Sequence, residues 1–141
     1  MQTFFITYNT GEYDSYHEYV YAIDAESKEV LLAEIDRACD EYIAAYSGWL
    51  NECNLVKQEY KQYRKERGGS NGLDVKSYHN KIRKAYDKFP YPSSMIIFGN
   101  KIAPFDELNV SGKDKAIVDS GLDIMTIDEY IESCRPVMEN E

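Results

Sequence analysis

The sequence predicts an α+β fold with a small, mainly antiparallel sheet, a long helical hairpin and a short C-terminal helix. Two observations carry this prediction. Residues 16–23 alternate with a period of two, as in a half-buried strand, whereas apolar residues recur every three or four positions over residues 31–63, as on one helix face. The expected elements come in runs of strands and runs of helices, without the strict alternation of parallel α/β proteins.

Residues 1–24 are expected to form a β-hairpin. Thr3–Tyr8 is β-branched and aromatic, and Tyr16–Ile23 shows the period-two alternation. Asn9-Thr10-Gly11 supplies residues that favour a turn between them. The tip that follows, Glu12–Tyr16, is acidic and rich in tyrosine.

Residues 25–89 are expected to form a helical hairpin. Asp24 is the expected N-cap of its first helix, because a carboxylate accepts hydrogen bonds from the free N–H groups of a first turn. The glycine-rich stretch 68–72 ends that helix, and Asp74–Phe89 forms a second one that stops at Pro90. A short connection makes the pair antiparallel. The apolar face of the first helix comprises Leu31, Ile35, Cys39, Tyr42, Tyr46, Trp49, Cys53, Val56, Tyr60 and Tyr63.

Residues 93–141 are expected to form short strands and the C-terminal helix. Met95–Phe98 reads as a buried strand, with a turn at Gly99-Asn100 and a return strand after it. Ala116–Val118 and Leu122–Met125 are interpreted as a second hairpin. Thr126 and Glu129 have the spacing of a capping box, which begins a last helix over Ile127–Cys134.

The length of 141 residues indicates one domain, which spans residues 1–141. The chain has three cysteines at wide spacing, Cys39, Cys53 and Cys134, which predicts reduced, packed thiols rather than disulfides. The N-terminal residues lack the features of a secretory signal, and no apolar run is long enough to cross a membrane. A cytoplasmic protein is therefore expected, with no membrane partner.

The formal net charge of −9 is unevenly distributed. Residues 1–56 carry two basic and 11 acidic side chains, and residues 89–141 carry four basic and ten acidic ones. Residues 57–88 are the exception, with ten basic and four acidic side chains. The chain is thus an acidic protein with one basic segment.

Few residues suit catalysis or metal binding. The sequence has no phosphate-binding glycine loop, nucleophile elbow or metal-binding motif, and the only histidines are His17 and His79. Both are interpreted as surface residues, and no cofactor, metal site or catalytic residue is predicted. An enzyme that uses His79 is the least favoured of three functional hypotheses.

The basic segment has two functional interpretations, binding of nucleic acid and binding of a nucleotide. It is also explained as a solvated helix face or as a partner for the chain's own acidic segments. Cations interleaved with aromatic rings are what nucleic acids or nucleotides require. The remainder of the chain would repel a polyanion, and a nucleotide, which needs only a local pocket, is an equally weighted alternative. Its candidate contacts are four cations and two stacking rings: Arg64, Arg67, Lys81, Arg83, Tyr63 and Tyr78.

The acidic residues of the hairpin and first helix form the other candidate site. A continuous negative surface would steer towards a basic, nucleic-acid-binding groove on another protein, although solubility alone also explains such a surface. The candidate partner-binding residues are Glu12, Tyr13, Asp14, Tyr16, Glu18 and Trp49. The first helix is expected to be longer than the second, which leaves an apolar face for the sheet or for a homodimer.

The N-terminal quarter resembles a group of small bacteriophage and mobile-element proteins. The shared pattern is the strand Phe5–Tyr8, the turn Gly11–Tyr16, the strand Tyr19–Asp24 and the acidic helix start at Glu26–Glu29. The resemblance implies a phage-encoded anti-defence protein, of anti-CRISPR or anti-restriction type, in the cytoplasm of a host cell. The leading hypothesis is therefore a non-catalytic inhibitor that blocks a host nucleic-acid-processing complex through its acidic surface. The alternative is an anti-defence protein that sequesters a nucleotide signal.

Overall fold

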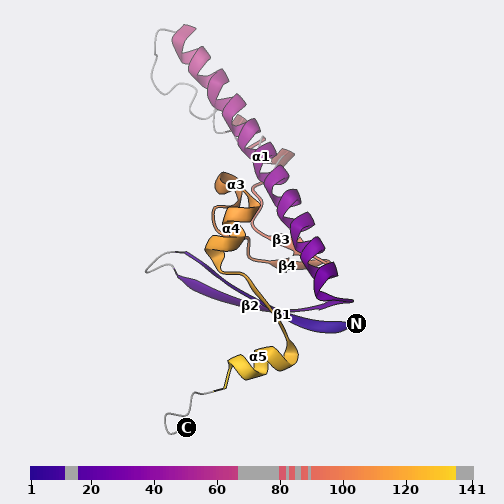
Figure 1. The fold of residues 1–141 in the computed structure, drawn as a ribbon. Helices are drawn as coiled ribbons and strands as arrows, with labels where there is room; N and C mark the ends of the chain where they lie inside the picture. The colour runs from indigo at the N-terminus through magenta and orange to yellow at the C-terminus, as the bar shows by residue number, and fades with distance from the viewer. Residues whose placement is uncertain (12–15, 67–79, 82, 85–86, 89, 136–141) are drawn as a thin grey trace.

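A computed structural model describes residues 1–11, 16–66, 80–81, 83–84, 87–88 and 90–135 of the chain, and it has the expected α+β fold (Figure 1). A three-stranded antiparallel sheet has the order β2-β1-β5, and a separate two-stranded sheet is formed by β3 and β4. The strands are β1 (Gln2–Thr10), β2 (His17–Ala25), β3 (Met95–Ile97), β4 (Asn100–Ile102) and β5 (Asp123–Thr126). The helices are α1 (Lys28–Glu66), α3 (Leu108–Ser111), α4 (Lys113–Ser120) and α5 (Ile127–Ser133).

The main sheet is built around β1, whose side chains alternate between two covered faces. Phe4, Ile6 and Tyr8 are buried against the first part of α1, the β3–β4 pair and α3 and α4. On the opposite face, Phe5 stacks on Tyr130 of α5 with ring centroids 4.3 Å apart. Figure 1 shows α5 on one side of the sheet and α1, α3 and α4 on the other. Both faces of β1 therefore have an apolar partner, as its hydrophobic sequence requires.

The expected hairpin of residues 1–24 is confirmed, with β1 paired to β2 in the register Gln2↔Ala25 to Thr10↔His17. The expected N-cap Asp24, however, lies within β2 and accepts a hydrogen bond from Thr3 Oγ1 at 2.6 Å. Helix α1 begins four residues later, at Lys28, and its N-cap is Ser27, whose Oγ accepts from the N–H of Val30 at 3.2 Å. Pairing with β1 extends the strand past the carboxylate, so the next residue with a short polar side chain caps the helix.

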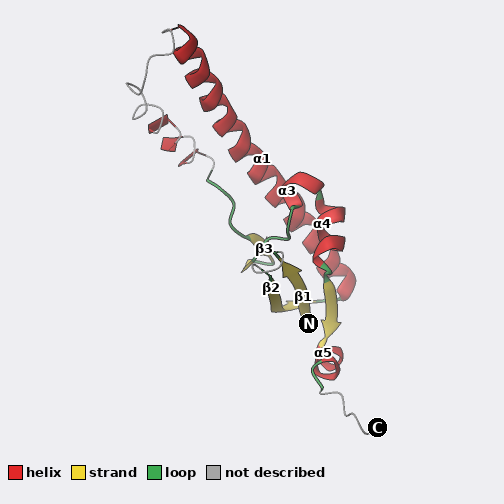
Figure 2. Cartoon of the chain, turned by 90° about the vertical axis from the view of Figure 1, so that its left-hand side faces the viewer, coloured by secondary structure: helices red, strands yellow, loops and turns green. Residues whose placement is uncertain are grey.

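Helix α1 has 39 residues and a length of ~60 Å at ~1.5 Å per residue. Its first half packs Leu31, Ile35 and Cys39 into the core, whereas its second half extends beyond α3 and the β3–β4 pair (Figure 2). The described residues between 80 and 88 are helical and connect to this second half through ion pairs: Lys88 to Glu52 and Lys81 to Glu59, both 3.2 Å. The order of these pairs is that of antiparallel segments. The expected loop 68–72 lies outside the described residues.

The expected hairpin at residues 116–125 is wrong. Ala116–Val118 belongs to α4, in which Ala116 is buried, and β5 pairs with β1 instead. Gly121, with φ of 63°, ends α4 in a left-handed conformation, and its N–H bonds to carbonyls of the last turn. The short apolar stretch was compatible with either a strand or a buried helix turn, and packing against α1 and β1 favours the helix.

The C-terminal helix is confirmed at Ile127–Ser133, with Cys134 as its C-cap. The Thr126 side chain accepts from the N–H of Glu129, and the Glu129 carboxylate accepts from the N–H of Thr126, each at 3.2 Å. This is the expected capping box. Among the described residues, no helix combines the length and apolar character that a bilayer crossing requires.

Candidate functional site

The β3–β4 turn is displaced by one residue from its expected position, and this displacement exposes an aromatic ring. Phe98 and Gly99 occupy the two turn positions with φ of 46° and 79°, so both have left-handed backbone conformations. Such conformations suit Gly or Asn, whereas a bulky residue is disfavoured by about 1–2 kcal/mol. Phe98 occupies this position and is 44% exposed to solvent.

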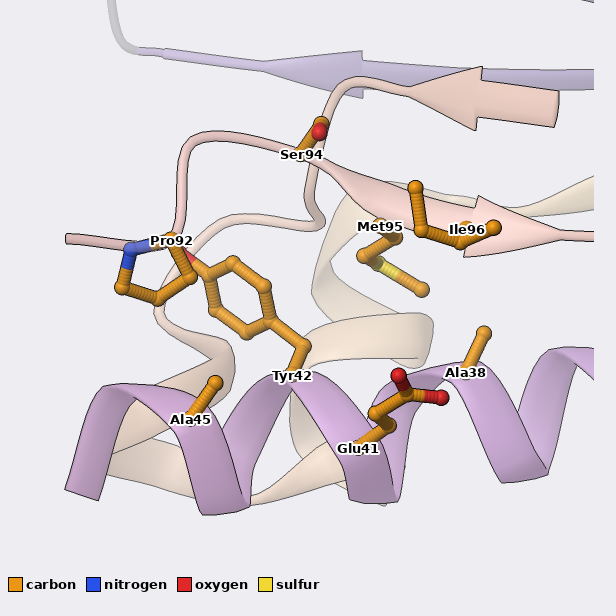
Figure 3. A pocket seen from close by; sticks show the side chains of 8 residues that line it. All are labelled: Ala38, Glu41, Tyr42, Ala45, Pro92, Ser94, Met95 and Ile96. Atoms are coloured by element: carbon orange, nitrogen blue, oxygen red, sulfur yellow. The ribbon is translucent and has the colours of Figure 1, made fainter. Parts of the chain in front are cut away.

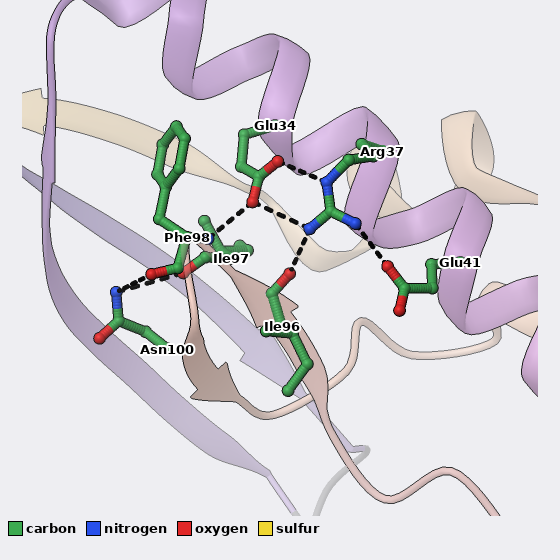
Figure 4. A network of polar contacts seen from close by, with 7 residues as sticks. All are labelled: Glu34, Arg37, Glu41, Ile96, Ile97, Phe98 and Asn100. Carbon is green, nitrogen blue, oxygen red and sulfur yellow. Dashed lines mark hydrogen bonds and ion pairs between the residues drawn. The ribbon is translucent and has the colours of Figure 1, made fainter.

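An ion-pair network on α1 holds this turn in place (Figure 4). The N–H of Phe98 donates to Glu34 Oε2 at 2.6 Å, and Arg37 Nη2 donates to the carbonyl of Ile96 at 3.1 Å. Arg37 also bonds Glu34 through Nε at 2.5 Å and forms an ion pair with Glu41. Hydrogen bonding to Arg37 and to Phe98 keeps the pKa of the Glu34 carboxyl below its usual value. We name Glu34, Arg37 and Glu41 the α1 clamp.

Next to the turn is a groove of about 490 Å³ at the junction of β2 and α1. Its lining is mixed, with five apolar residues, two carboxylates and one amide: Met1, Ala22, Asp24, Ala25, Glu26, Val30, Phe98 and Asn100. Val30 and Phe98 are partly exposed, whereas Ala25 is buried. This volume lies within the ~300–1,000 Å³ range of ligand pockets. We name this feature the junction groove.

Not all of the acidic side chains on the surface are free. Glu34 and Glu41 bind Arg37, and Asp40 pairs with Lys113 of α4 at 3.4 Å. Within the described part of the chain, no ion pair involves Glu18, Asp24, Glu26, Glu29 or Asp36. Two of these five, Asp24 and Glu26, line the junction groove. Unpaired negative charge and exposed apolar surface therefore coincide there.

The structure describes three of the six predicted partner-binding residues, and it places Trp49 on a different element from the other two. Tyr16 and Glu18 are exposed at the start of β2, and Glu12, Tyr13 and Asp14 lie outside the described residues. Trp49 is half-buried on α1 and makes an edge contact with Tyr91, with ring centroids 4.9 Å apart, so it is a packing residue beside Tyr46. Sequence reasoning missed Phe98, although a large apolar residue directly before Gly-Asn is an unusual turn residue that could have signalled it.

The predicted nucleotide contacts are described only in part. Arg67 and Tyr78, and the side chains of Tyr63 and Arg64, lie outside the described part of the chain, as does His79. Arg83 is exposed. Lys81 lines a groove of about 330 Å³ with Lys84, Lys88, Glu52, Val56 and Glu59. Because the ion pairs with Glu59 and Glu52 involve two of these three lysines, the groove has little excess positive charge.

A third, smaller depression of about 80 Å³ lies between α1 and the segment leading into β3 (Figure 3). Tyr42, Ala38 and Ala45 of α1 face Pro92 and Met95 across it. Burial, followed by interaction with Tyr91, raises the pKa of Tyr42 to about 12, so its hydroxyl stays protonated at neutral pH. The depression is too small for a nucleotide.

Among the described residues, the three thiols and His17 form no assembled reactive centre. Burial, chiefly, raises the pKa of the Cys39 thiol to about 12, which opposes nucleophilic chemistry. Cys53 is buried and Cys134 is exposed. His17 is exposed on β2. Among the described residues, no three His, Cys, Asp or Glu side chains are grouped so as to hold a metal ion.

Comparison of the chain with protein-family models, with curated proteins and with solved structures gives no match.

Proposed function

We propose that this chain is a non-catalytic protein-binding inhibitor that uses its acidic surface to occupy a basic surface on a host nucleic-acid-processing complex. The observation that supports the proposal is the coincidence, at the β2–α1 junction, of carboxylates that form no ion pair in the described part of the chain with exposed apolar side chains that line the same groove. Exposed charge alone provides solubility, whereas exposed charge around apolar side chains is the composition of a binding surface.

The electrostatics fit a competitor of nucleic acid. A groove that binds nucleic acid is lined with Arg and Lys, so a protein of net charge −9 is attracted to it before contact. Such a protein would act in the cytoplasm of the host cell, as bacteriophage anti-defence proteins of the anti-CRISPR or anti-restriction type do.

The test is inhibition of reconstituted host nucleases. Purified chain is added to DNA cleavage by a panel of CRISPR-type effectors and restriction endonucleases, at 50 and 300 mM salt. The expected result is inhibition of at least one enzyme, weaker at the higher salt. As a control, DNA incubated with the purified chain alone should stay intact, because the chain is proposed to be non-catalytic.

A charge-reversed chain makes this test specific. The triple variant Glu18→Lys, Asp24→Lys, Glu26→Lys is expected to lose inhibition by about tenfold or more. The matched control reverses three exposed acidic residues of α4 and α5: Asp119→Lys, Asp128→Lys and Glu132→Lys. Equal loss in both variants would show that net charge, and not this surface, is responsible.

A second candidate function, sequestration of a nucleotide, is supported by the three lysines that line one groove beside α1. Lys84 has no ion pair in the described part of the chain, and phosphate would have to displace Glu52 and Glu59 from the other two. Calorimetry with cyclic and linear nucleotides at high protein concentration tests it. If no nucleotide gives a heat of binding, nucleotide sequestration is excluded as the function.

A further inference from the structure

We propose that the junction groove is the docking site for an arginine-bearing segment of the partner protein, with the Phe98 ring as its anchor. The inference rests on the proposed protein-binding function and names the chemistry of the partner. The occupant is an extended segment in which an arginine is next to an apolar side chain.

The first argument is that Phe98 occupies a turn position that disfavours it. With φ of 46°, this position would be more stable with Asn or Gly, and 44% of the Phe98 surface stays exposed within its own chain. Strained residues of this kind mark functional sites when the surrounding structure holds them in place. The α1 clamp does so through the bond from the Phe98 N–H to Glu34.

The second argument is charge complementarity. Asp24 and Glu26 line the groove, are exposed, and have no ion pair in the described part of the chain; Asp24 Oδ1 also accepts the hydrogen bond from Thr3. A guanidinium can pair with a carboxylate and also stack on an aromatic face, which a lysine ammonium does less well. The rim of the groove thus favours arginine.

The third argument is the apolar floor. Ala22, Ala25 and Val30 line the same groove as the carboxylates and Phe98, so an apolar side chain next to the arginine would be removed from water. A purely basic segment would leave this surface wet, and a purely apolar one would leave the carboxylates unpaired. The groove therefore selects a mixed segment.

The experiment is an NMR titration of the ¹⁵N-labelled full chain with three blocked peptides. The test peptide has the core Arg-Leu-Arg between glycine and serine residues, and the two comparison peptides have the cores Glu-Leu-Glu and Arg-Ser-Arg. The expected result is saturable shifts of the Glu26, Val30 and Gly99 amides with the first peptide. The acidic peptide should give none, and the Arg-Ser-Arg peptide should bind about tenfold more weakly.

Three variants locate the site. Phe98→Asn, which keeps the turn, is expected to weaken the Arg-Leu-Arg peptide at least about tenfold, and Glu26→Gln about two- to fivefold. Glu132→Gln on α5 is the matched control and should bind as the parent does. Unchanged affinity in Phe98→Asn, or equal binding of the acidic peptide, overturns the inference.

Two other occupants are distinguishable in the same spectra. A second copy of the chain in the groove would shift the Val30 and Gly99 amides on simple dilution, without peptide. Residues 136–141 as the occupant would shift them on truncation after Arg135. Either result overturns the proposed docking site. Peptide binding without nuclease inhibition would instead support the docking site and contradict the anti-defence function. Nuclease inhibition that survives Phe98→Asn would support the anti-defence function and contradict the docking site.

Discussion

Glu34 and Phe98 are 64 positions apart in sequence and are joined by a 2.6 Å hydrogen bond from the Phe98 N–H to Glu34 Oε2. This bond connects α1 to the tip of the β3–β4 turn, and Arg37 strengthens it by orienting the same carboxylate. The clamp therefore controls both the stability of the second sheet and the position of the exposed ring.

Replacing Glu34 with Gln is expected to lower the free energy of unfolding by about 1–2 kcal/mol at pH 7, since three hydrogen bonds to the carboxylate are weakened, two from Arg37 and one from the Phe98 N–H. Folding lowers the pKa of this carboxyl from its usual 4.5. Its contribution is thus complete above pH 4.5 and is lost as the pH falls through the lower folded pKa. Urea unfolding between pH 3 and 7 measures this, with Glu29→Gln, an exposed residue of the same helix, as control.

Phe98→Asn is expected to raise the free energy of unfolding by about 0.5–1 kcal/mol, because Asn adopts φ of 46° more readily than Phe. Gly99→Ala should lower it by about 1 kcal/mol. A Cβ at Gly99 would meet nothing within 4 Å, so the cost comes from the backbone alone. Thermal unfolding of both variants tests the turn assignment, and stabilisation by Gly99→Ala would contradict it.

Removal of the Tyr8 hydroxyl is expected to destabilise the fold by about 1–3 kcal/mol, since this buried group donates to the carbonyl of Ala103. Burial, chiefly, raises the pKa of Tyr8 well above its usual value, which keeps the donor protonated. Denaturant unfolding of Tyr8→Phe measures the loss. Tyr16→Phe, at an exposed position, should leave the stability unchanged.

Thr126→Ala removes the N-cap of α5 and is expected to cost about 1 kcal/mol. The effect should be concentrated in α5, whose amides would exchange faster while those of the α1 core keep their protection. Hydrogen exchange followed by NMR shows this. Thr126→Ser keeps the oxygen that accepts from Glu129 and should behave as the parent does.

A single thiol should react rapidly with Ellman's reagent at pH 8. Cys134 is exposed, whereas Cys39 and Cys53 are buried and the pKa of Cys39 is about 12. Cys134→Ser is expected to abolish the fast phase, and the two remaining thiols should react only in denaturant. Two fast thiols in the folded protein would contradict the packing of α1.

The parts of the fold that follow from short-range patterns could be predicted from the sequence. The period-two strand around Tyr19 and Tyr21, the apolar face of α1 and the Thr126–Glu129 box each depend on neighbours within a few positions. Of the candidate site, the acidic character of the surface could be predicted in the same way. The secondary structure of Asp24 and of Ala116–Val118 could not be predicted, because contacts with strands and helices distant in sequence decide it.

The sequence by itself determined the periodicities, the segregation of charge and the absence of familiar catalytic motifs, since each is a local property of the chain. Tertiary structure alone decided which carboxylates are neutralised and which remain free. Arg37 forms ion pairs with Glu34 and Glu41, and Lys113 forms one with Asp40. It also placed Phe98 in one groove with Val30 and Glu26. The α1 clamp holds Phe98 at a turn position that, by local backbone preference, favours Asn or Gly.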